Sequence, residues 1–219
     1  MTGVVGHLEL TWVCVAALFG LLVMERLQNE VGRRVLKSVA SLAFVGTAVS
    51  QGLPEEHHAW FILVGLALSV VGDVCLLTTQ HGRAFTTGIG AFFLAHLAYI
   101  GAFVLRGLDW TVAAGACLLM VPLARKTYRW LSTSLPEGLH RPVQAYLAVI
   151  SLMVASAAAA WGGNHSMTWA LPTALLFLIS DVGVAMHRFK APHFSIKAWA
   201  LPTYYAAQIS FALEVATNH

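Results

Sequence analysis

Long apolar stretches alternate with short polar ones along the whole chain. Taking about 20 apolar residues as one membrane crossing, we expect eight helical crossings. Their predicted ranges are 8–25, 35–51, 59–78, 85–105, 109–124, 143–161, 168–186 and 196–216. The pattern therefore predicts an all-α fold, a polytopic membrane bundle of eight transmembrane helices that forms a single domain over residues 1–219.

The composition agrees with this pattern. Of the 219 residues, 58% are hydrophobic and only 11% are charged, and the mean hydropathy is +0.72. Soluble domains are less apolar and carry more charge. The formal net charge of +3 is small and spread over the predicted connections, so we expect no nucleic-acid partner. The three cysteines are far apart in sequence and predict neither a disulfide framework nor a metal site.

Basic residues are distributed unequally between the two sides of the predicted bundle. Of the 13 Lys and Arg residues, only Arg106 falls at an even-numbered connection. Because Lys and Arg collect in cytoplasmic loops, the odd connections should face the cytoplasm and both termini should face away from it. We see no targeting signal, and with the compact connections this favours a bacterial inner membrane.

Two acids lie inside predicted crossings. Asp73 follows Gly72 in the third, and Asp181 follows Ser180 in the seventh. A carboxylate at membrane depth costs roughly 2.5–3.5 kcal/mol, so it is a functional candidate by default. With the predicted orientation, both acids lie at the same depth, roughly 8 Å from the cytoplasmic end of their helices.

The two acids are also regularly spaced. They are 108 residues apart (181 − 73), and this offset maps the second, third and fourth predicted crossings onto the sixth, seventh and eighth. Asp73 and His96 have the same spacing as Asp181 and Tyr204. This regularity is compatible with a parallel four-plus-four repeat.

Six further polar side chains lie within the predicted crossings and are expected to face inward, because residues three or four apart share one face of a helix. They are Lys37, His96, Tyr99, Tyr204, Tyr205 and Gln208. Each of them also has a purely structural interpretation, as an interhelical hydrogen bond or a membrane anchor.

Two carboxyl groups that share a low-dielectric cavity cannot both ionise easily, so we expect the pair to hold a single proton. One acid and one base suit the hydrolysis of a bond that reacts through an oxocarbenium ion. A zinc hydrolase would need several histidines at membrane depth, and only His96 qualifies. We therefore expect no metal and no other cofactor.

The chain resembles the lysoplasmalogenase (YhhN-like) family of integral membrane proteins. The matching signals, in order, are Gly72-Asp73, Phe85, Gly88, Phe92, His96, Tyr99, Ser180-Asp181 and Tyr204-Tyr205-Ala206-Ala207-Gln208. Lys37 matches the family's basic residue, although the Pro that often follows it is Ser38 here. The match extends from Lys37 to Phe211.

The resemblance implies an eight-helix enzyme that hydrolyses the vinyl ether bond of lysoplasmalogens to a fatty aldehyde and glycerophosphoethanolamine or glycerophosphocholine. The family's two aspartates match Asp73 and Asp181, which we interpret as the catalytic pair without assigning the acid. The six polar residues would bind the substrate, with Lys37 as a partner for the phosphate. The expected partners are a lysophospholipid substrate and membrane lipid, and no oligomeric state is predicted.

Three other interpretations use the same acids. A proton-coupled transporter of a small molecule or lipid would use them as a relay, and Gly72 and Pro202 give it weak support. An intramembrane aspartyl protease is disfavoured because its Gly-x-Gly-Asp signature fails at Val70. A sensor or assembly protein would tolerate the loss of either acid.

Overall fold

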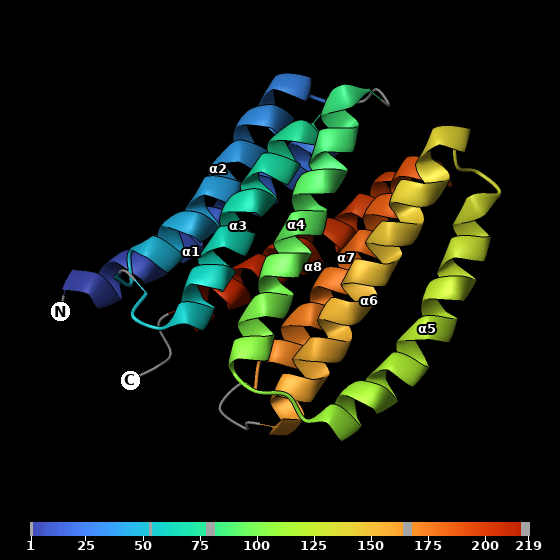
Figure 1. The fold of residues 1–219 in the computed structure, drawn as a ribbon. Helices are drawn as coiled ribbons and strands as arrows, with labels where there is room; N and C mark the ends of the chain where they lie inside the picture. Colours follow the sequence, from blue (N-terminus) through green and yellow to red (C-terminus); the bar gives the residue numbers. More distant parts are fainter. Residues whose placement is uncertain (1, 53, 78–81, 164–167, 216–219) are drawn as a thin grey trace.

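The computed structural model describes residues 2–52, 54–77, 82–163 and 168–215. Within these ranges it contains no strand and eight α-helices (Figure 1): α1 (Thr2–Arg26), α2 (Glu30–Val49), α3 (His57–Cys75), α4 (Arg83–Leu105), α5 (Trp110–Ser132), α6 (His140–Gly163), α7 (Ala170–Phe189) and α8 (Phe194–Glu214). A short 3-10 turn, η1 (Glu137–Leu139), precedes α6. The all-α prediction is confirmed, and each predicted crossing corresponds to one helix. The ends predicted at 78 and 216 lie outside the described residues.

Helix α5 is longer than its predicted crossing. The apolar pattern stops at 124, but the helix continues to Ser132. The added turns carry basic residues, which are good helix formers, and no Gly or Pro interrupts them before Pro136. At the other end Asp109 caps the helix, because its side chain accepts the backbone N–H groups of Thr111 and Val112. The length of the apolar stretch therefore underestimated the length of helix α5.

Five of the described helices, α1, α3, α4, α6 and α7, are long and apolar enough to cross a membrane. Many large apolar side chains, such as Trp12, Phe19 and Leu118, are exposed on the outside of the bundle. Such a surface is suited to lipid rather than water. The chain is thus an integral membrane protein, whereas crossing by the more polar α2, α5 and α8 stays a prediction.

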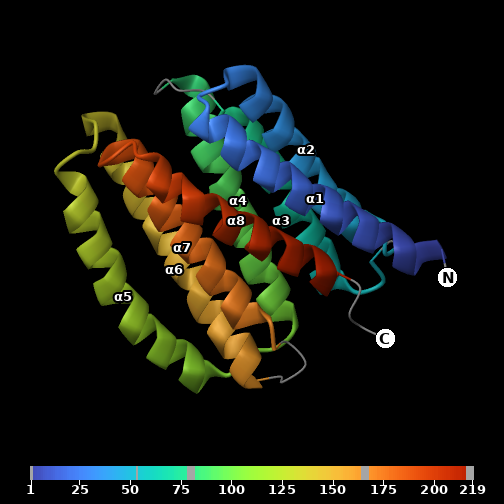
Figure 2. The same cartoon turned by 180° about the vertical axis from the view of Figure 1, so that it is seen from behind.

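Consecutive helices pair along the chain: α1 with α2, α3 with α4, α5 with α6 and α7 with α8. The start of α1 and the end of α8 lie towards the same side of the bundle (Figure 1). Helix α8 crosses the bundle obliquely (Figure 2) and contacts α1, α2 and α3 as well as α7. Helix α5 lies at an edge and packs mainly against α6.

The helix contacts are partly symmetric. Helix α8 contacts α2, and α4 contacts α6, which are equivalent pairs if the first four helices repeat as the last four. However, α8 also packs on α1, whereas α4 makes no comparable contact with α5 among the described residues. The four-plus-four repeat remains a prediction.

Two glycines of α3 let it approach α4 closely. A Cβ atom at Gly65 would overlap the ring of Tyr99, and one at Gly72 would overlap the ring of Phe92. Any larger residue would separate the helices, because packed interiors have no spare room. Gly72 therefore fixes the position of the neighbouring Asp73 relative to α4.

Candidate active site

One cavity of about 270 Å³ joins the two acids. It is bordered by Asp73 of α3 and Asp181 of α7. Most of its remaining wall is apolar and comes from α4, the end of α5, α6 and α7; the wall includes Phe85, Phe92, Leu131, Val143, Leu147, Ile150 and Leu178. Two acids that are 108 residues apart in sequence thus face a common apolar space.

Asp73 is buried and has three donors around its carboxylate. The Lys37 ammonium lies 3.1 Å from Oδ1. Oδ2 accepts hydrogen bonds from the Ser41 hydroxyl at 2.6 Å and the Tyr204 hydroxyl at 2.7 Å. A carboxylate offers about four lone-pair positions, so one position on Oδ1 is left for a further donor. The cation and the two hydroxyls suit an ionised Asp73.

A second layer of side chains holds these partners in place. Gln208 donates to the Tyr204 hydroxyl at 2.9 Å, and Tyr99 donates to the Gln208 carbonyl oxygen at 2.9 Å. Tyr205 donates to the backbone oxygen of Lys37 at 3.4 Å. Of these four side chains, only Tyr204 borders the cavity. Tyr99, Tyr205 and Gln208 lie behind the Asp73 partners, so they can support these groups without touching a ligand in the cavity.

Asp181 has different surroundings. Its Oδ2 accepts a hydrogen bond from Tyr146 at 2.7 Å, and Nε2 of His96 lies 3.5 Å from the same oxygen. Among the described residues, no Lys or Arg forms an ion pair with Asp181. The side chain is buried apart from a small fraction that reaches the cavity. Unlike Asp73, Asp181 is thus not matched by a permanent cation.

The tautomer of His96 follows from its backbone contact. Its Nδ1 lies 2.6 Å from the carbonyl oxygen of Phe92, which can only accept, so Nδ1 carries the proton. In the neutral ring, Nε2 then turns its lone pair towards Asp181. This nitrogen is buried and has no other partner in the described part of the chain. A lone pair facing a carboxyl oxygen suits a proton held between His96 and Asp181.

Each acid is bound by a polar residue of the other half of the chain. The equal spacings in sequence join Asp73 to His96 and Asp181 to Tyr204. In the structure Tyr204 donates to Asp73, whereas His96 lies against Asp181. His96 does not itself border the cavity, and of the six residues predicted to bind substrate only Lys37 and Tyr204 do.

Two residues that sequence reasoning left out of the site contact the acids directly. Ser41 donates to Asp73 and Tyr146 donates to Asp181. Tyr146 lies near the start of α6 and Asp181 near the end of α7. Since successive helices run in opposite directions, both lie towards the same end of the bundle. This shared position along the bundle was the signal in the sequence that could have indicated the contact. However, a single Tyr in an apolar segment does not reveal its partner.

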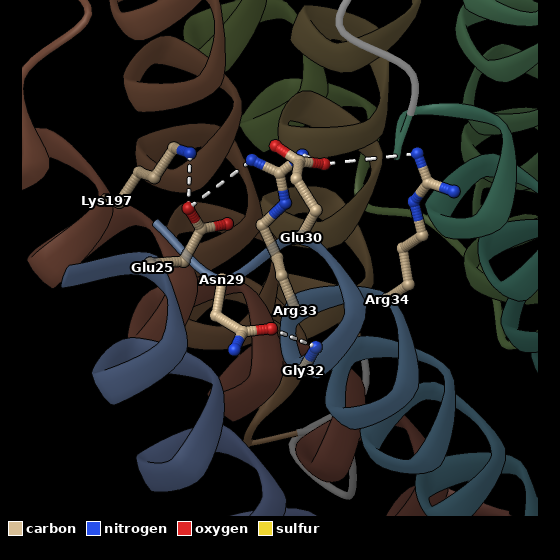
Figure 3. A network of polar contacts seen from close by, with 7 residues as sticks. All are labelled: Glu25, Asn29, Glu30, Gly32, Arg33, Arg34 and Lys197. Atoms are coloured by element: carbon tan, nitrogen blue, oxygen red, sulfur yellow. Dashed lines mark hydrogen bonds and ion pairs between the residues drawn. The ribbon is translucent and has the colours of Figure 1, made fainter. Parts of the chain in front are cut away.

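A charged cluster borders the cavity where α1 ends and where α2 and α8 begin (Figure 3). The Glu25 oxygen Oε2 lies 2.6 Å from Nζ of Lys197 and 3.8 Å from Nη1 of Arg33. Arg33 also pairs with Glu30 at 2.6 Å. The cluster therefore connects three helices at the mouth of the cavity.

The chain matches the model of the YhhN family over residues 32–215. The mouse (Mus musculus) protein named lysoplasmalogenase TMEM86B is 34% identical to it over 166 residues, which are 75% of this chain and 67% of the mouse protein. Bovine (Bos taurus) lysoplasmalogenase TMEM86A is 33% identical over 159 residues, 69% of this chain and 63% of that protein.

A bacterial relative is also similar. The protein named lysoplasmalogenase of Mycobacterium tuberculosis (strain CDC 1551 / Oshkosh) is 29% identical over 177 residues, 78% of this chain and 66% of the relative. The chain thus spans about two thirds of the length of these relatives or slightly less. No solved structure matches it.

Proposed function

This chain belongs to the YhhN family, and from that premise we propose that it hydrolyses the vinyl ether bond of lysoplasmalogens. The products are a fatty aldehyde and glycerophosphoethanolamine or glycerophosphocholine. The observation that carries the proposal is the cavity in which Asp73 and Asp181 face one apolar space. Relatives that are named lysoplasmalogenase support the choice of substrate.

The cavity suits the reacting part of such a lipid. Its volume of about 270 Å³ is near the lower end of ligand pockets, which are roughly 300–1,000 Å³. It can thus enclose the glycerol and the ether bond, while the rest of the alkenyl chain extends along apolar helix faces. The apolar wall also keeps bulk water away from the reacting bond, which strengthens the electrostatic effect of the two acids.

In the proposed reaction Asp181 is the general acid. Its proton moves to the alkenyl carbon that is not bonded to oxygen, and the carbon–carbon double bond becomes a single bond. The positive charge is then shared between the neighbouring carbon and the ether oxygen, as an oxocarbenium ion. Tyr146 holds the carboxyl group in place, and the lone pair of His96 provides a second position for the proton.

Asp73 is the carboxylate of the pair. Its negative charge stabilises the oxocarbenium ion, and its remaining lone pair orients the attacking water. Water adds to the charged carbon and loses a proton to a carboxylate, which gives a hemiacetal. The hemiacetal breaks into the aldehyde and the free hydroxyl of the glycerol, so one water is consumed and the two acids regain their first state. Lys37, Ser41 and Tyr204 keep Asp73 ionised and oriented through these steps.

The test uses purified, monodisperse protein in detergent. We expect aldehyde release from a lysoplasmalogen and none from its saturated ether analogue, which cannot form the same cation by protonation. Asp73→Asn and Asp181→Asn should each lower kcat by about 10²–10⁴-fold. Full activity in either variant would end the proposal. Substrate counterflow in liposomes without any product would instead favour the transporter.

We also propose the orientation that the basic residues indicate, in a bacterial inner membrane. The connections between α1 and α2, α3 and α4, α5 and α6, and α7 and α8 would face the cytoplasm, and both termini would face away from it. The mouth of the cavity would then open towards the cytoplasmic surface. Labelling of single cysteines placed at each end of the bundle, in intact cells and in inverted vesicles, tests this.

A further inference from the structure

The part of the charged cluster that borders the cavity contains two cations and one carboxylate. Two cations, Arg33 and Lys197, approach the same oxygen of Glu25 (Figure 3). All three side chains border the cavity and are mostly buried. Glu30, the other partner of Arg33, is half exposed and does not border the cavity. We call Glu25, Arg33 and Lys197 the mouth cluster.

The cations of the mouth cluster lie on the same two helices as residues that contact Asp73 further inside the cavity. On α2, Arg33, Lys37 and Ser41 are four residues apart and share one face, and the inner two contact Asp73. Arg33 lies about 6 Å along the axis from Lys37. On α8, Lys197 lies about 10 Å along the axis from Tyr204, which also contacts Asp73. Two helices thus each place a cation on the mouth side of a residue that contacts Asp73, about 6 Å along α2 and about 10 Å along α8.

We propose that the mouth cluster binds the zwitterionic phosphodiester head group of the substrate: Arg33 and Lys197 bind the phosphate, and Glu25 binds the ammonium group of ethanolamine or choline. This inference rests on the proposed hydrolysis of lysoplasmalogens. The phosphate takes the place of Glu25 between the two cations, and the released carboxylate then pairs with the ammonium group. Each ion pair that Glu25 makes with Arg33 or Lys197 is replaced by one with the phosphate, so no charge is left unpaired.

Lys37 is not free for the phosphate, because it is the counter-ion of Asp73 at 3.1 Å. The dimensions of the substrate agree with binding at the mouth instead. Six bonds separate the phosphorus from the ether carbon that becomes charged, and an extended chain covers about 3.8 Å in three bonds, hence roughly 7–8 Å in total. This lies between the two axial distances from the mouth cluster to the Asp73 partners. A phosphate at the mouth therefore places the vinyl ether beside Asp73.

The first experiment measures binding, so that it does not depend on turnover. The probe is a 1-O-alkyl-glycerophosphocholine, and the matched ligand without a head group is the 1-O-alkylglycerol of equal chain length. In Arg33→Gln and Lys197→Gln we expect the Kd of the phosphocholine probe to rise about 10-fold or more, as for the loss of one charged contact. The Kd of the alkylglycerol should change by less than about 2-fold.

Arg34→Gln is the matched control. Arg34 is the next residue on α2 and carries the same charge, but it is largely exposed, pairs only weakly with Glu30 at 3.9 Å and does not border the cavity. Both ligands should bind this variant as they bind the unaltered protein. Lys197→Arg keeps the positive charge and should bind the probe about as tightly as the unaltered protein does. This variant replaces Lys197→Gln in the test if the Gln variant does not fold. Equal weakening of both ligands in the cluster variants would show that the cluster only ties three helices together and would overturn the inference.

Glu25→Gln separates the two parts of the head group. It should weaken the phosphocholine probe about 5-fold or more, whereas a 1-O-alkylglycerol 3-phosphate, which has no ammonium group, should bind as well as before or more tightly. Weaker binding of the phosphate ligand would contradict the role given to Glu25. Inorganic phosphate and glycerophosphocholine should compete poorly, and competition equal to that of the lipid would identify a site for free solutes instead.

The outcomes also separate this inference from the proposed function. Binding of the probe that depends on the mouth cluster, together with no aldehyde from lysoplasmalogen, would reject the hydrolase and keep the head-group site. Aldehyde release with no dependence on the cluster would keep the hydrolase and reject the head-group site.

Discussion

Asp73 and Asp181 occupy two regions of one cavity that differ in charge. Asp73 lies among α2, α3 and α8, where a Lys ammonium and two hydroxyl groups surround it. Asp181 lies among α4, α6 and α7, where its partners are a Tyr hydroxyl and an imidazole. In sequence the two acids look alike, since each follows a small residue and precedes Val within an apolar segment.

This difference in charge favours a different role in the reaction for each acid. A cation and two hydrogen-bond donors beside a carboxyl group compensate the negative charge of its carboxylate form and so favour that form. A carboxyl group in an apolar site without a cation avoids a large desolvation cost if it keeps its proton. The surroundings therefore favour Asp181 as the acid and Asp73 as the carboxylate, a choice that the sequence left open.

The largest effect is expected from the acid itself. Asp181→Asn should lower kcat about 10²–10⁴-fold, and Asp73→Asn should also be severe. In D2O the aldehyde gains one deuterium at the carbon next to the carbonyl, and a fixed acid adds it to one face only. The residual product of Asp73→Asn should keep this facial selectivity, whereas that of Asp181→Asn should lose it, as read by NMR of the derivatised aldehyde. The reverse result would exchange the two roles.

The ion pair of Asp73 gives the next largest effect. Lys37→Met should lower the free energy of unfolding by about 1.5–3 kcal/mol, because it leaves a buried charge with only hydroxyl partners. In the double variant Lys37→Met with Asp73→Asn, most of that loss should be recovered. Thermal unfolding of the four proteins in one detergent measures the coupling. Additive losses would mean that the pair contributes nothing beyond its separate contacts.

Two matched tyrosine variants compare the regions directly. Tyr146→Phe removes the hydroxyl that donates to Asp181 and should lower kcat about 10-fold. Tyr204→Phe leaves Lys37 and Ser41 on Asp73, so kcat should fall less than about 3-fold. The control is the melting temperature, which should fall more for Tyr204→Phe because Gln208 also loses its acceptor. Equal losses of kcat would contradict the difference between the regions.

The smallest effect is expected two contacts away from Asp73. Tyr99→Phe removes the hydroxyl that donates to Gln208, and the ring can keep its stacking on Phe211 at 3.9 Å. We expect a loss of about 1 kcal/mol in unfolding free energy and a change of less than about 2-fold in kcat. A large loss of activity with unchanged stability would place Tyr99 in contact with the substrate.

Much of the fold and part of the site could be predicted from the sequence. The apolar segments locate the eight helices, because a long apolar segment leaves water whatever its neighbours are. Its backbone groups must then pair within the segment, which makes it a helix. The predicted equal distance of about 8 Å from the helix ends was wrong, because Asp73 is two residues before the end of α3 and Asp181 is eight residues before the end of α7. Both acids nevertheless border one cavity. The full length of α5 escaped, because basic residues continue a helix where the apolar pattern has ended.

The partners of each acid could not be predicted in this way. The equal spacings join Asp73 to His96 and Asp181 to Tyr204, but the folded chain exchanges these partners between its halves. Tyr146 and the mouth cluster also depend on which helices lie together, as when the oblique α8 brings Lys197 to Glu25 of α1. Hydropathy and periodicity are properties of single segments, so the sequence by itself determined the helices and the presence of an acid within α3 and α7. Charge matching at each acid depends on contacts between segments, so only the tertiary structure decided which acid has a cation beside it.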